Sequence, residues 1–175
     1  LSKSIFNESI IFMFWIGNCP LPSYPIVVVL RIPGKKFGKP KALTPTEIKE
    51  IIKKFTFVAK VARESGFTGV QIHSAHGYLL SEFLSPDINL RNDEWGGSIE
   101  NRTRIHVEII KSIRQELGSD FPISVKMNSA DFQRGGLTPE EAVVAAKIIE
   151  SAGVDNIELS GGTYEQPKLL GLDKV

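Results

Sequence analysis

Two histidines and a tyrosine lie close together in the stretch "GVQIHSAHGY" at residues 69–78. His73, His76 and Tyr78 end an apolar run that predicts a buried strand. Imidazole nitrogens can donate hydrogen bonds to a carbonyl or phenolate oxygen, and a tyrosine hydroxyl can deliver a proton. The three residues could therefore polarise a substrate and protonate it.

Two other interpretations of the histidines are open. They could be structural histidines whose hydrogen bonds are satisfied inside the fold. They could also bind zinc, which would need a third ligand at the strand ends. Asp131 is available for that role, but the spacing offers no evident third ligand and we expect no metal site.

Lys126 interrupts the otherwise apolar segment "ISVKMNS" at residues 123–129. A lysine is almost never fully buried without a partner. If the end of this strand faces a site, the ammonium group could stabilise an anionic cofactor or intermediate. The alternative is a side chain that reaches solvent at a strand terminus.

Repeated helix and strand signals predict the elements that position these residues. "LTPTE" (43–47) and "LTPEE" (137–141) each combine a threonine N-cap, a proline and a glutamate in a capping box. The helices that follow lead into "ESGFTGVQIHS" (64–74) and "ESAGVDNIELS" (150–160). A third helix, begun by Ser98, precedes a strand in "FPISVKM".

This alternation predicts an α/β fold with right-handed crossovers and a parallel sheet. Ligands bind beyond the carboxyl ends of the strands in such sheets, whether barrel or open. The segments at those ends are polar: "HSAHGY", "KMNSAD" and "SGGTY". We therefore expect the site there.

The connection after the first of these strands is about twenty residues longer than a usual unit, and we expect it to be a loop without helix that walls the site. Asn89, Arg91 and Asp93 would either tie this loop down by local hydrogen bonds or line the site. "LSGG" (159–162) favours a plain turn over a phosphate-binding nest.

Composition narrows the class of protein. The chain has 175 residues, of which 42% are hydrophobic, and a net charge of +1, which gives no electrostatic case for binding nucleic acid or an anionic membrane. Cys19 is the only cysteine, which is typical of a reducing compartment, and we expect a cytoplasmic protein. The run "IIFMFWIG" (10–17) is too short to span a bilayer as a helix. "PIVVVLRI" (25–32) is the only strand that we predict before residue 40.

The segment "HSAHGYLLSEFLSPDINLRNDEWGGSIENRTR" (73–104) resembles the old yellow enzyme family of NAD(P)H:flavin oxidoreductases. The family pattern runs His, Asn or His three later, Gly-Tyr-Leu-Leu, Phe-Leu-Ser-Pro, Asn-x-Arg-x-Asp, an aromatic, Gly-Gly-Ser and Glu-Asn-Arg. Trp95 stands where the family usually has tyrosine, as a packing aromatic. The resemblance continues through "VKMNSADFQRGGLT" to "LSGGTYEQP".

The resemblance implies an FMN-dependent (β/α)₈ TIM barrel. NAD(P)H would reduce the flavin, which would pass hydride to the β-carbon of an α,β-unsaturated carbonyl compound, an enone or enal. His73 and His76 fall on the pair that grips the substrate carbonyl, and Tyr78 on the acid that protonates the α-carbon. Lys126 falls where the family places a basic residue near N1 and the C2 carbonyl of the flavin.

The resemblance covers only part of a barrel, roughly strands 4 to 6 with their helices. It assigns residues 38–175 to a partial FMN-dependent oxidoreductase domain and leaves 1–37 as a divergent N-terminal arm. A partial barrel exposes sheet edges, so we expect poor FMN binding unless the chain self-associates as a homo-oligomer. The alternative to an enzyme is a truncated, non-catalytic remnant without flavin binding.

Overall fold

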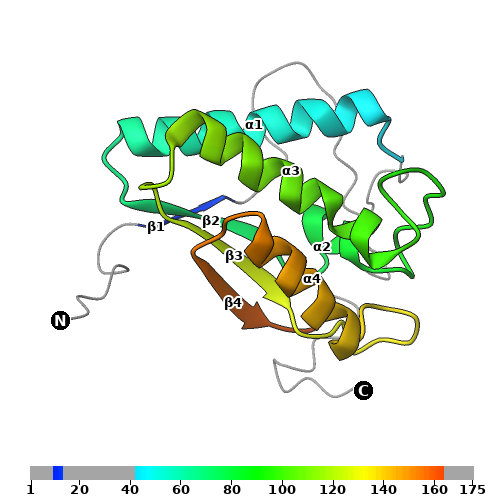
Figure 1. Ribbon diagram of the computed structural model, residues 1–175. Helices are drawn as coiled ribbons and strands as arrows, with labels where there is room; N and C mark the ends of the chain where they lie inside the picture. The colour runs from blue at the N-terminus through cyan, green and yellow to red at the C-terminus, as the bar shows by residue number, and fades with distance from the viewer. Residues whose placement is uncertain (1–9, 14–41, 164–175) are drawn as a thin grey trace, which may run out of the picture.

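The computed structural model describes residues 10–13 and 42–163 (Figure 1). The predicted strand at 25–32 and the predicted domain boundary after residue 37 lie outside these ranges. The elements in chain order are β1 (Ile10–Met13), α1 (Pro45–Glu64), β2 (Gly69–Ser74), α2 (Leu79–Leu84), α3 (Ile99–Leu117), β3 (Ile123–Asn128), α4 (Pro139–Ser151) and β4 (Asn156–Ser160).

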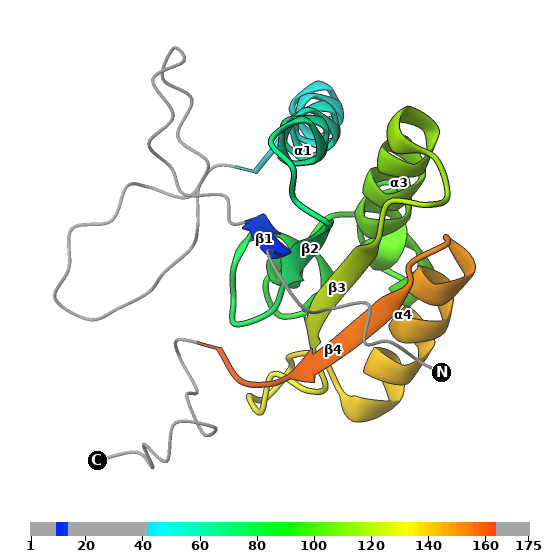
Figure 2. The same ribbon diagram turned by 90° about the vertical axis from the view of Figure 1, so that its left-hand side faces the viewer.

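The four strands form one parallel sheet in the order β1-β2-β3-β4. The helices α1, α3 and α4 cover one face of this sheet, and α3 packs between the other two (Figure 2). This arrangement confirms the predicted α/β fold, and β2, β3 and β4 begin close to the expected positions. No helix in the described part of the chain is long and apolar enough to cross a membrane.

The strand β1 corrects the sequence analysis. The expectation that 25–32 is the only strand before residue 40 is wrong, because Ile10–Met13 forms a strand that pairs with Gly69–Ile72 of β2. The four residues are all apolar, and such a run shows no alternation that would distinguish a strand from a helix. Its identity as a strand depends on the partner edge that β2 offers, which lies more than fifty residues away along the chain.

The two faces of the sheet differ in chemistry because successive side chains in a strand point to opposite sides. Val70, Ile72 and Val125 pack with the helices in the apolar core. The residues between them face the other way, toward what is the interior in a complete (β/α)₈ barrel. That interior face carries polar side chains: Gln71, His73, Ser124, Lys126, Asn156 and Glu158.

The helix ends follow the predicted signals. Thr44 and Thr138 are N-caps with complete capping boxes, and Ser98 caps α3 by accepting a hydrogen bond from the backbone of residue 101. Gly66 and Gly153, which follow α1 and α4, have φ angles of 86° and 98°. Glycine enters this left-handed region without steric cost, so each helix can stop sharply before the next strand.

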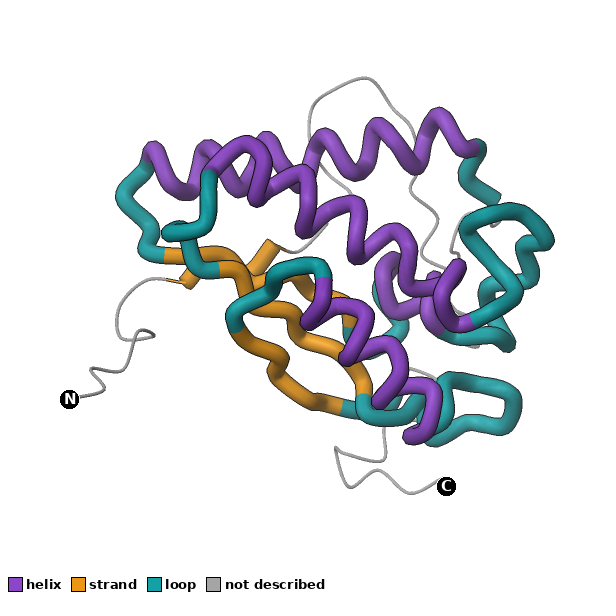
Figure 3. Tube along the Cα trace, viewed as in Figure 1, coloured by secondary structure: helices purple, strands orange, loops and turns teal. Residues whose placement is uncertain are grey.

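The expectation that the connection after β2 contains no helix is wrong. Leu79–Leu84 forms the short helix α2, which packs against α3. Leu80, Phe83 and Leu84 are buried, so these side chains gain more from contact with α3 than from an extended loop. The irregular parts of the connection are therefore 75–78 and 85–98 (Figure 3).

The buried Arg102 joins three helices. Its guanidinium donates to the carbonyl oxygens of Leu84, at the end of α2, and Gly97, before α3. It also forms an ion pair with Glu141 in the first turn of α4. Only 3% of this side chain is exposed, and a buried guanidinium needs such a set of acceptors. The interaction fixes the long connection to both neighbouring helices.

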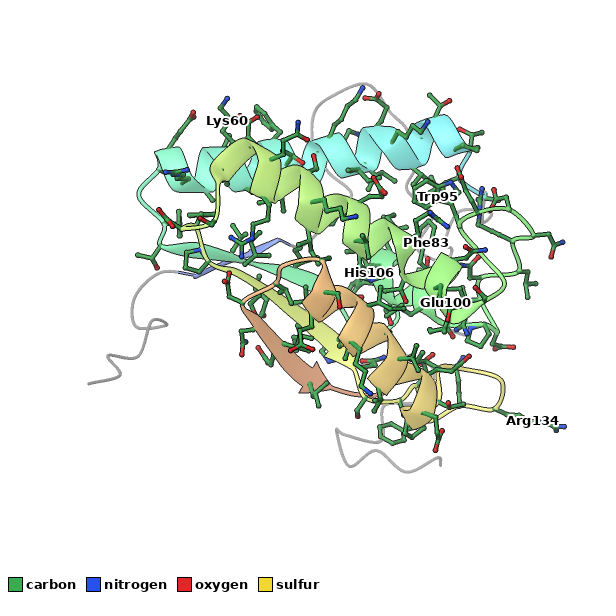
Figure 4. All side chains as sticks on the ribbon, viewed as in Figure 1. Lys60, Phe83, Trp95, Glu100, His106 and Arg134 are labelled. Carbon is green, nitrogen blue, oxygen red and sulfur yellow. The ribbon has the colours of Figure 1, made fainter. Side chains whose placement is uncertain are left out.

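His106 joins α3 to the end of β2 (Figure 4). Its Nε2 lies 2.6 Å from the hydroxyl oxygen of Ser74, and the ring is fully buried. Burial lowers the pKa of His106 to about 4, although a hydrogen bond to the backbone of Thr103 acts in the opposite direction. The ring is therefore neutral in the folded protein at pH 7.

His106 should make the folded protein less stable in mild acid. In the unfolded chain histidine binds a proton near pH 6.5, whereas folded His106 does not until about pH 4. Stability is therefore lost as the pH falls through this range, by roughly 2 kcal/mol between pH 7 and pH 4.5 from this group. The variant His106→Gln should show a correspondingly smaller loss in urea unfolding at the two pH values. An equal loss in both proteins would contradict the assignment, since His73 contributes to both alike.

Candidate active site at the carboxyl ends of the strands

The carboxyl ends of β2, β3 and β4 meet at the end of the sheet where the connections after β2 and β3 also lie (Figure 3). His73 is in β2, His76 follows in the next turn, and Tyr78 immediately precedes α2. The ring centroid of His73 lies 5.3 Å from that of His76 and 5.0 Å from that of Tyr78. The structure thus brings the three predicted residues together around His73.

The position of His76 is fixed by contacts to two other strands. Its φ angle of 63° is uncommon outside glycine, although histidine is among the residues that adopt it more often. Its backbone N–H donates to Oδ1 of Asn128 at 3.1 Å, and its Nε2 lies 2.7 Å from the hydroxyl oxygen of Ser160. The contact with Ser160 is what we would expect of a structural histidine, and it uses one of the two ring nitrogens.

Asn128 connects the ends of all three strands. Besides accepting from His76, its Nδ2 donates to the carboxylate of Asp131 at 2.9 Å and to the carbonyl oxygen of Gly162 at 3.0 Å. The residue is 1% exposed, so none of these hydrogen bonds competes with bulk water. The backbone that carries His76 is therefore tied to the segments that follow β3 and β4.

Lys126 lies beside His73 in the register of β2 and β3, and beside Glu158 in the register of β3 and β4. Its Nζ is 2.8 Å from Oε1 of Glu158. The other carboxylate oxygen of Glu158 accepts from Nε2 of Gln71 at 2.8 Å. The lysine is thus paired on the interior face, where 22% of its side chain and 44% of that of Glu158 are exposed.

The two imidazoles are neutral at physiological pH. Burial is the main cause that lowers the pKa of His73 to about 4, and His76 and Lys126 lower it further, while Glu158 raises it. Burial and Lys126 also lower the pKa of His76, and Glu158 again opposes them. A neutral imidazole carries one N–H, which it can donate without bringing a charge; the ring of His76 has its N–H at Nδ1 when Nε2 accepts from the hydroxyl of Ser160.

Asp131 does not join the histidines. It is 1% exposed, and its two carboxylate oxygens accept from Asn128 and from the backbone N–H of Leu137, both at 2.9 Å. The third ligand that the zinc interpretation would need is therefore engaged in holding the loop after β3. Among the described residues, no cluster of three or more histidine, cysteine, aspartate or glutamate side chains could hold a metal ion.

The turn after β4 is held by the backbone of its neighbour. The N–H of Gly162 donates to the carbonyl oxygen of Ala130 at 3.1 Å, and Gly162 has a φ angle of 78°. An N–H group used in this way does not point toward a ligand. The contacts favour the predicted plain turn over a phosphate nest.

The polar residues of the connection after β2 hold it in place. Asn89 donates to the carbonyl oxygens of Phe83 and Trp95, both at 2.8 Å. Arg91 pairs with Asp93 and also donates to the backbone before α1. Trp95 is 3% exposed and packs in the core, so the predicted packing role of this aromatic is confirmed (Figure 4).

Sequence reasoning did not single out Asn128, Ser160 or Glu158. Their positions carried a signal, however, because "VKMNS" and "IELS" align when the two strands are placed in parallel register. In that register Glu158 stands opposite Lys126 and Ser160 opposite Asn128. Opposite charges in register on the same face of two neighbouring apolar strands indicate an ion pair between them, and here the pair is partly exposed.

A parallel sheet with helices on one face, and with chemical groups gathered at the carboxyl ends of its strands, is the arrangement of (β/α)₈ barrel enzymes. The described residues supply four strands of such a barrel. Residues 26–166 match the model of the NADH:flavin oxidoreductase / NADH oxidase family, and the protein belongs to that family. FMN is the cofactor of this family, and NADH or NADPH is the reductant.

Characterised relatives are considerably longer than this chain. It is 45% identical over 133 residues to an NADH oxidase of Thermoanaerobacter brockii, an alignment that covers 75% of this chain and 20% of the relative. It is also 45% identical over 134 residues to an NADH-dependent flavin oxidoreductase of Hypocrea jecorina, covering 75% and 32%.

Two solved structures also superpose on this chain over only part of their length. A 2-naphthoyl-CoA reductase in complex with 2-naphthoyl-CoA superposes with a TM-score of 0.71 at 41% identity, over 73% of this chain and 19% of that chain. An old yellow enzyme homologue from Zymomonas mobilis superposes with a TM-score of 0.66 at 27% identity, over 80% and 43%. This chain therefore spans less than half of either structure.

Asn128 should be essential for stability at this end of the sheet. Replacing it by alanine leaves the backbone N–H of His76, the carboxylate of Asp131 and the carbonyl of Gly162 without their partner. We expect Asn128→Ala to lower the free energy of unfolding by about 3 kcal/mol. The control Asn156→Ala removes an exposed amide with a bond to Ser124 and should cost less than about 1 kcal/mol. Equal losses in urea unfolding would contradict the role of Asn128.

Proposed function

We propose that the protein acts in an FMN-dependent NAD(P)H oxidoreductase that reduces the C=C bond of an α,β-unsaturated carbonyl compound. The observation that carries the proposal is the convergence of His73, His76 and Tyr78 around one point, with Lys126 on the neighbouring strand. Hydrogen-bond donors, a proton donor and a cation at one strand end suit a reaction in which charge develops on a carbonyl oxygen.

The two histidines would bind the carbonyl oxygen of the substrate. Their neutral rings can each donate an N–H, and the pKa values lowered by burial keep them neutral. As hydride reaches the β-carbon, negative charge moves to the carbonyl oxygen, where donors held in place stabilise it. The contacts of His76 to Asn128 and Ser160 supply that fixed geometry.

Tyr78 would protonate the α-carbon. Its ring meets that of His73 edge-on, at an interplanar angle of 61°, and its backbone is fixed where α2 begins. The first turn of that helix is packed into the core, which limits movement of the tyrosine. The tyrosine would give a proton to the carbon next to the carbonyl group, and the two histidines would donate hydrogen bonds to the carbonyl oxygen.

Lys126 would contact the pyrimidine edge of FMN. The donor set fits, because the half-buried ammonium lies in register with His73 and faces the barrel interior. FMN when bound supplies the hydride, taken first from NAD(P)H. A fixed positive charge near N1 and the C2 carbonyl would favour the anionic reduced form of the flavin.

The substrate class is a small molecule with a conjugated carbonyl. A solved relative is a reductase bound to 2-naphthoyl-CoA, a compound whose carbonyl is conjugated to a ring, which supports this class. We include a cytoplasmic location in the proposal, since NAD(P)H is the reductant and Cys19 is the only cysteine.

A second candidate is a truncated, non-catalytic remnant that has lost flavin binding. It is favoured by apolar side chains that stay exposed on the described unit, where Phe57 on α1 and Leu159 on β4 are each 65% exposed. Within the described residues, β4 pairs on one edge only.

Flavin content separates the two candidates. Burial of the exposed flanks by a second copy would supply the missing walls, so we expect FMN to bind in a homo-oligomer and not in the monomer. The purified chain should be incubated with excess FMN, freed of unbound cofactor and separated by size with light scattering and visible spectra. A flavin ratio near one in the oligomer supports the enzyme. Flavin in neither fraction supports the remnant, and a flavin-loaded monomer contradicts the need for self-association.

Tyr78→Phe should separate the two half-reactions. In the flavin-loaded protein, reduction of the flavin by NAD(P)H requires no proton from Tyr78, whereas reduction of the alkene does. We expect the second step to slow by about 100-fold or more while the first is unchanged. Stopped-flow absorbance of the flavin, with NADH and then with a simple enone, measures both. An equal loss in both steps would show that Tyr78 is not the proton donor.

A further inference from the structure

Glu158 is the partner of the only lysine on the interior face of the described sheet. Its Oε1 lies 2.8 Å from Nζ of Lys126, and its Oε2 accepts from Nε2 of Gln71 at 2.8 Å. Each carboxylate oxygen therefore has a donor from a different strand. Two donors on different strands restrict the direction of the carboxylate more than a single ion pair does, while 44% of the Glu158 side chain is exposed to solvent.

The support for this carboxylate continues across the sheet. Nε2 of Gln71 also lies 3.2 Å from the hydroxyl oxygen of Ser124, which accepts from Asn156 at 3.0 Å. Gln71 and Ser124 are 4% and 1% exposed. A complete barrel usually fills this layer with branched apolar side chains. Here the layer is polar, and Gln71 links the carboxylate of Glu158 to the hydroxyl of Ser124.

Few charged or titratable groups surround Lys126 at this end of the sheet. Those near Lys126 are His73 of β2, His76 after β2 and Glu158 of β4, while the ring of Tyr78 contacts that of His73. Lys126 lowers the pKa of both histidines and Glu158 raises it. The carboxylate thus offsets the ammonium group at the two rings.

We propose that Glu158 is a positioning residue that aims the ammonium group of Lys126 and offsets its charge at the His73–His76 pair. Glu158 acts through Lys126 and through its field, without contact with a substrate. Where the proposed function holds, the same carboxylate sets how strongly the site favours negative charge on a bound flavin. The charge balance itself is a property of the chain without cofactor.

Histidine titration by NMR on the chain without FMN tests the proposal. Glu158→Gln keeps the side-chain size and removes the negative charge, so the titration midpoints of His73 and His76 should fall by about half a unit, or roughly threefold in proton affinity. Lys126→Met should move both midpoints in the opposite direction, and the double variant should lie between the two single variants. A purely structural role of Glu158 would not produce opposite shifts.

The matched control is Glu116→Gln. Glu116 forms a lysine–glutamate pair of similar length, 2.7 Å, with Lys60 on the outer helices α1 and α3 (Figure 4). This variant should leave both midpoints unchanged. The proposal is overturned if Glu158→Gln also leaves the midpoints of His73 and His76 unchanged. If Glu158→Gln does not fold, the proposal is overturned when Lys126→Met fails to raise these midpoints.

A second measurement links the inference to the flavin. If FMN binds, Glu158→Gln should raise the reduction potential of the bound flavin, because the charge of Lys126 is no longer offset. An unchanged potential would overturn the link to the flavin. If FMN does not bind to the wild-type chain, the proposed function fails, while the histidine titration still decides the role of Glu158.

Discussion

The buried amide of Asn128 is the interaction on which the rest of the candidate site depends. Its three hydrogen bonds tie the backbone of His76 to the loop that contains Asp131 and to the turn at Gly162. The strands of a parallel sheet are joined only through long crossovers, so nothing in chain connectivity fixes their ends relative to one another. A side chain that bonds all three segments supplies that constraint. The left-handed conformation of His76 persists because its backbone N–H is held in this way.

Electrostatics at the strand ends follow from the same geometry. The interior face places an ammonium group beside two imidazoles, and burial with this cation keeps both rings neutral. The cation is partly withdrawn from water, and the carboxylate of Glu158 compensates its charge. The result is a site with neutral hydrogen-bond donors and one compensated cation. Such a site can stabilise negative charge on a ligand without carrying a large net charge itself.

Local signals in the sequence were reliable where neighbours along the chain decide the structure. Thr44, Ser98 and Thr138 cap their helices as expected, because a cap bonds backbone groups within three residues. The helix α2 and the strand β1 were missed, since each is stabilised by a partner far away in sequence, α3 in one case and β2 in the other. The sequence left Asp131 open as a zinc ligand, because its contacts with Asn128 and Leu137 depend on the tertiary structure.

The sequence by itself determined the α/β class, the order of the units and the types of residue that stand at the ends of the strands. Periodicity, caps and the types of residue at His73, Tyr78 and Lys126 are properties of short segments, so they can be read without knowing the fold. Tertiary structure alone decided which of these groups meet and what charge they carry. The distance between rings, the pairing of Lys126 with Glu158 and the lowered pKa of His73 all depend on strand register and burial. These quantities are set by groups on different strands, because the field and the solvent exclusion at one residue come from neighbours distant in the chain.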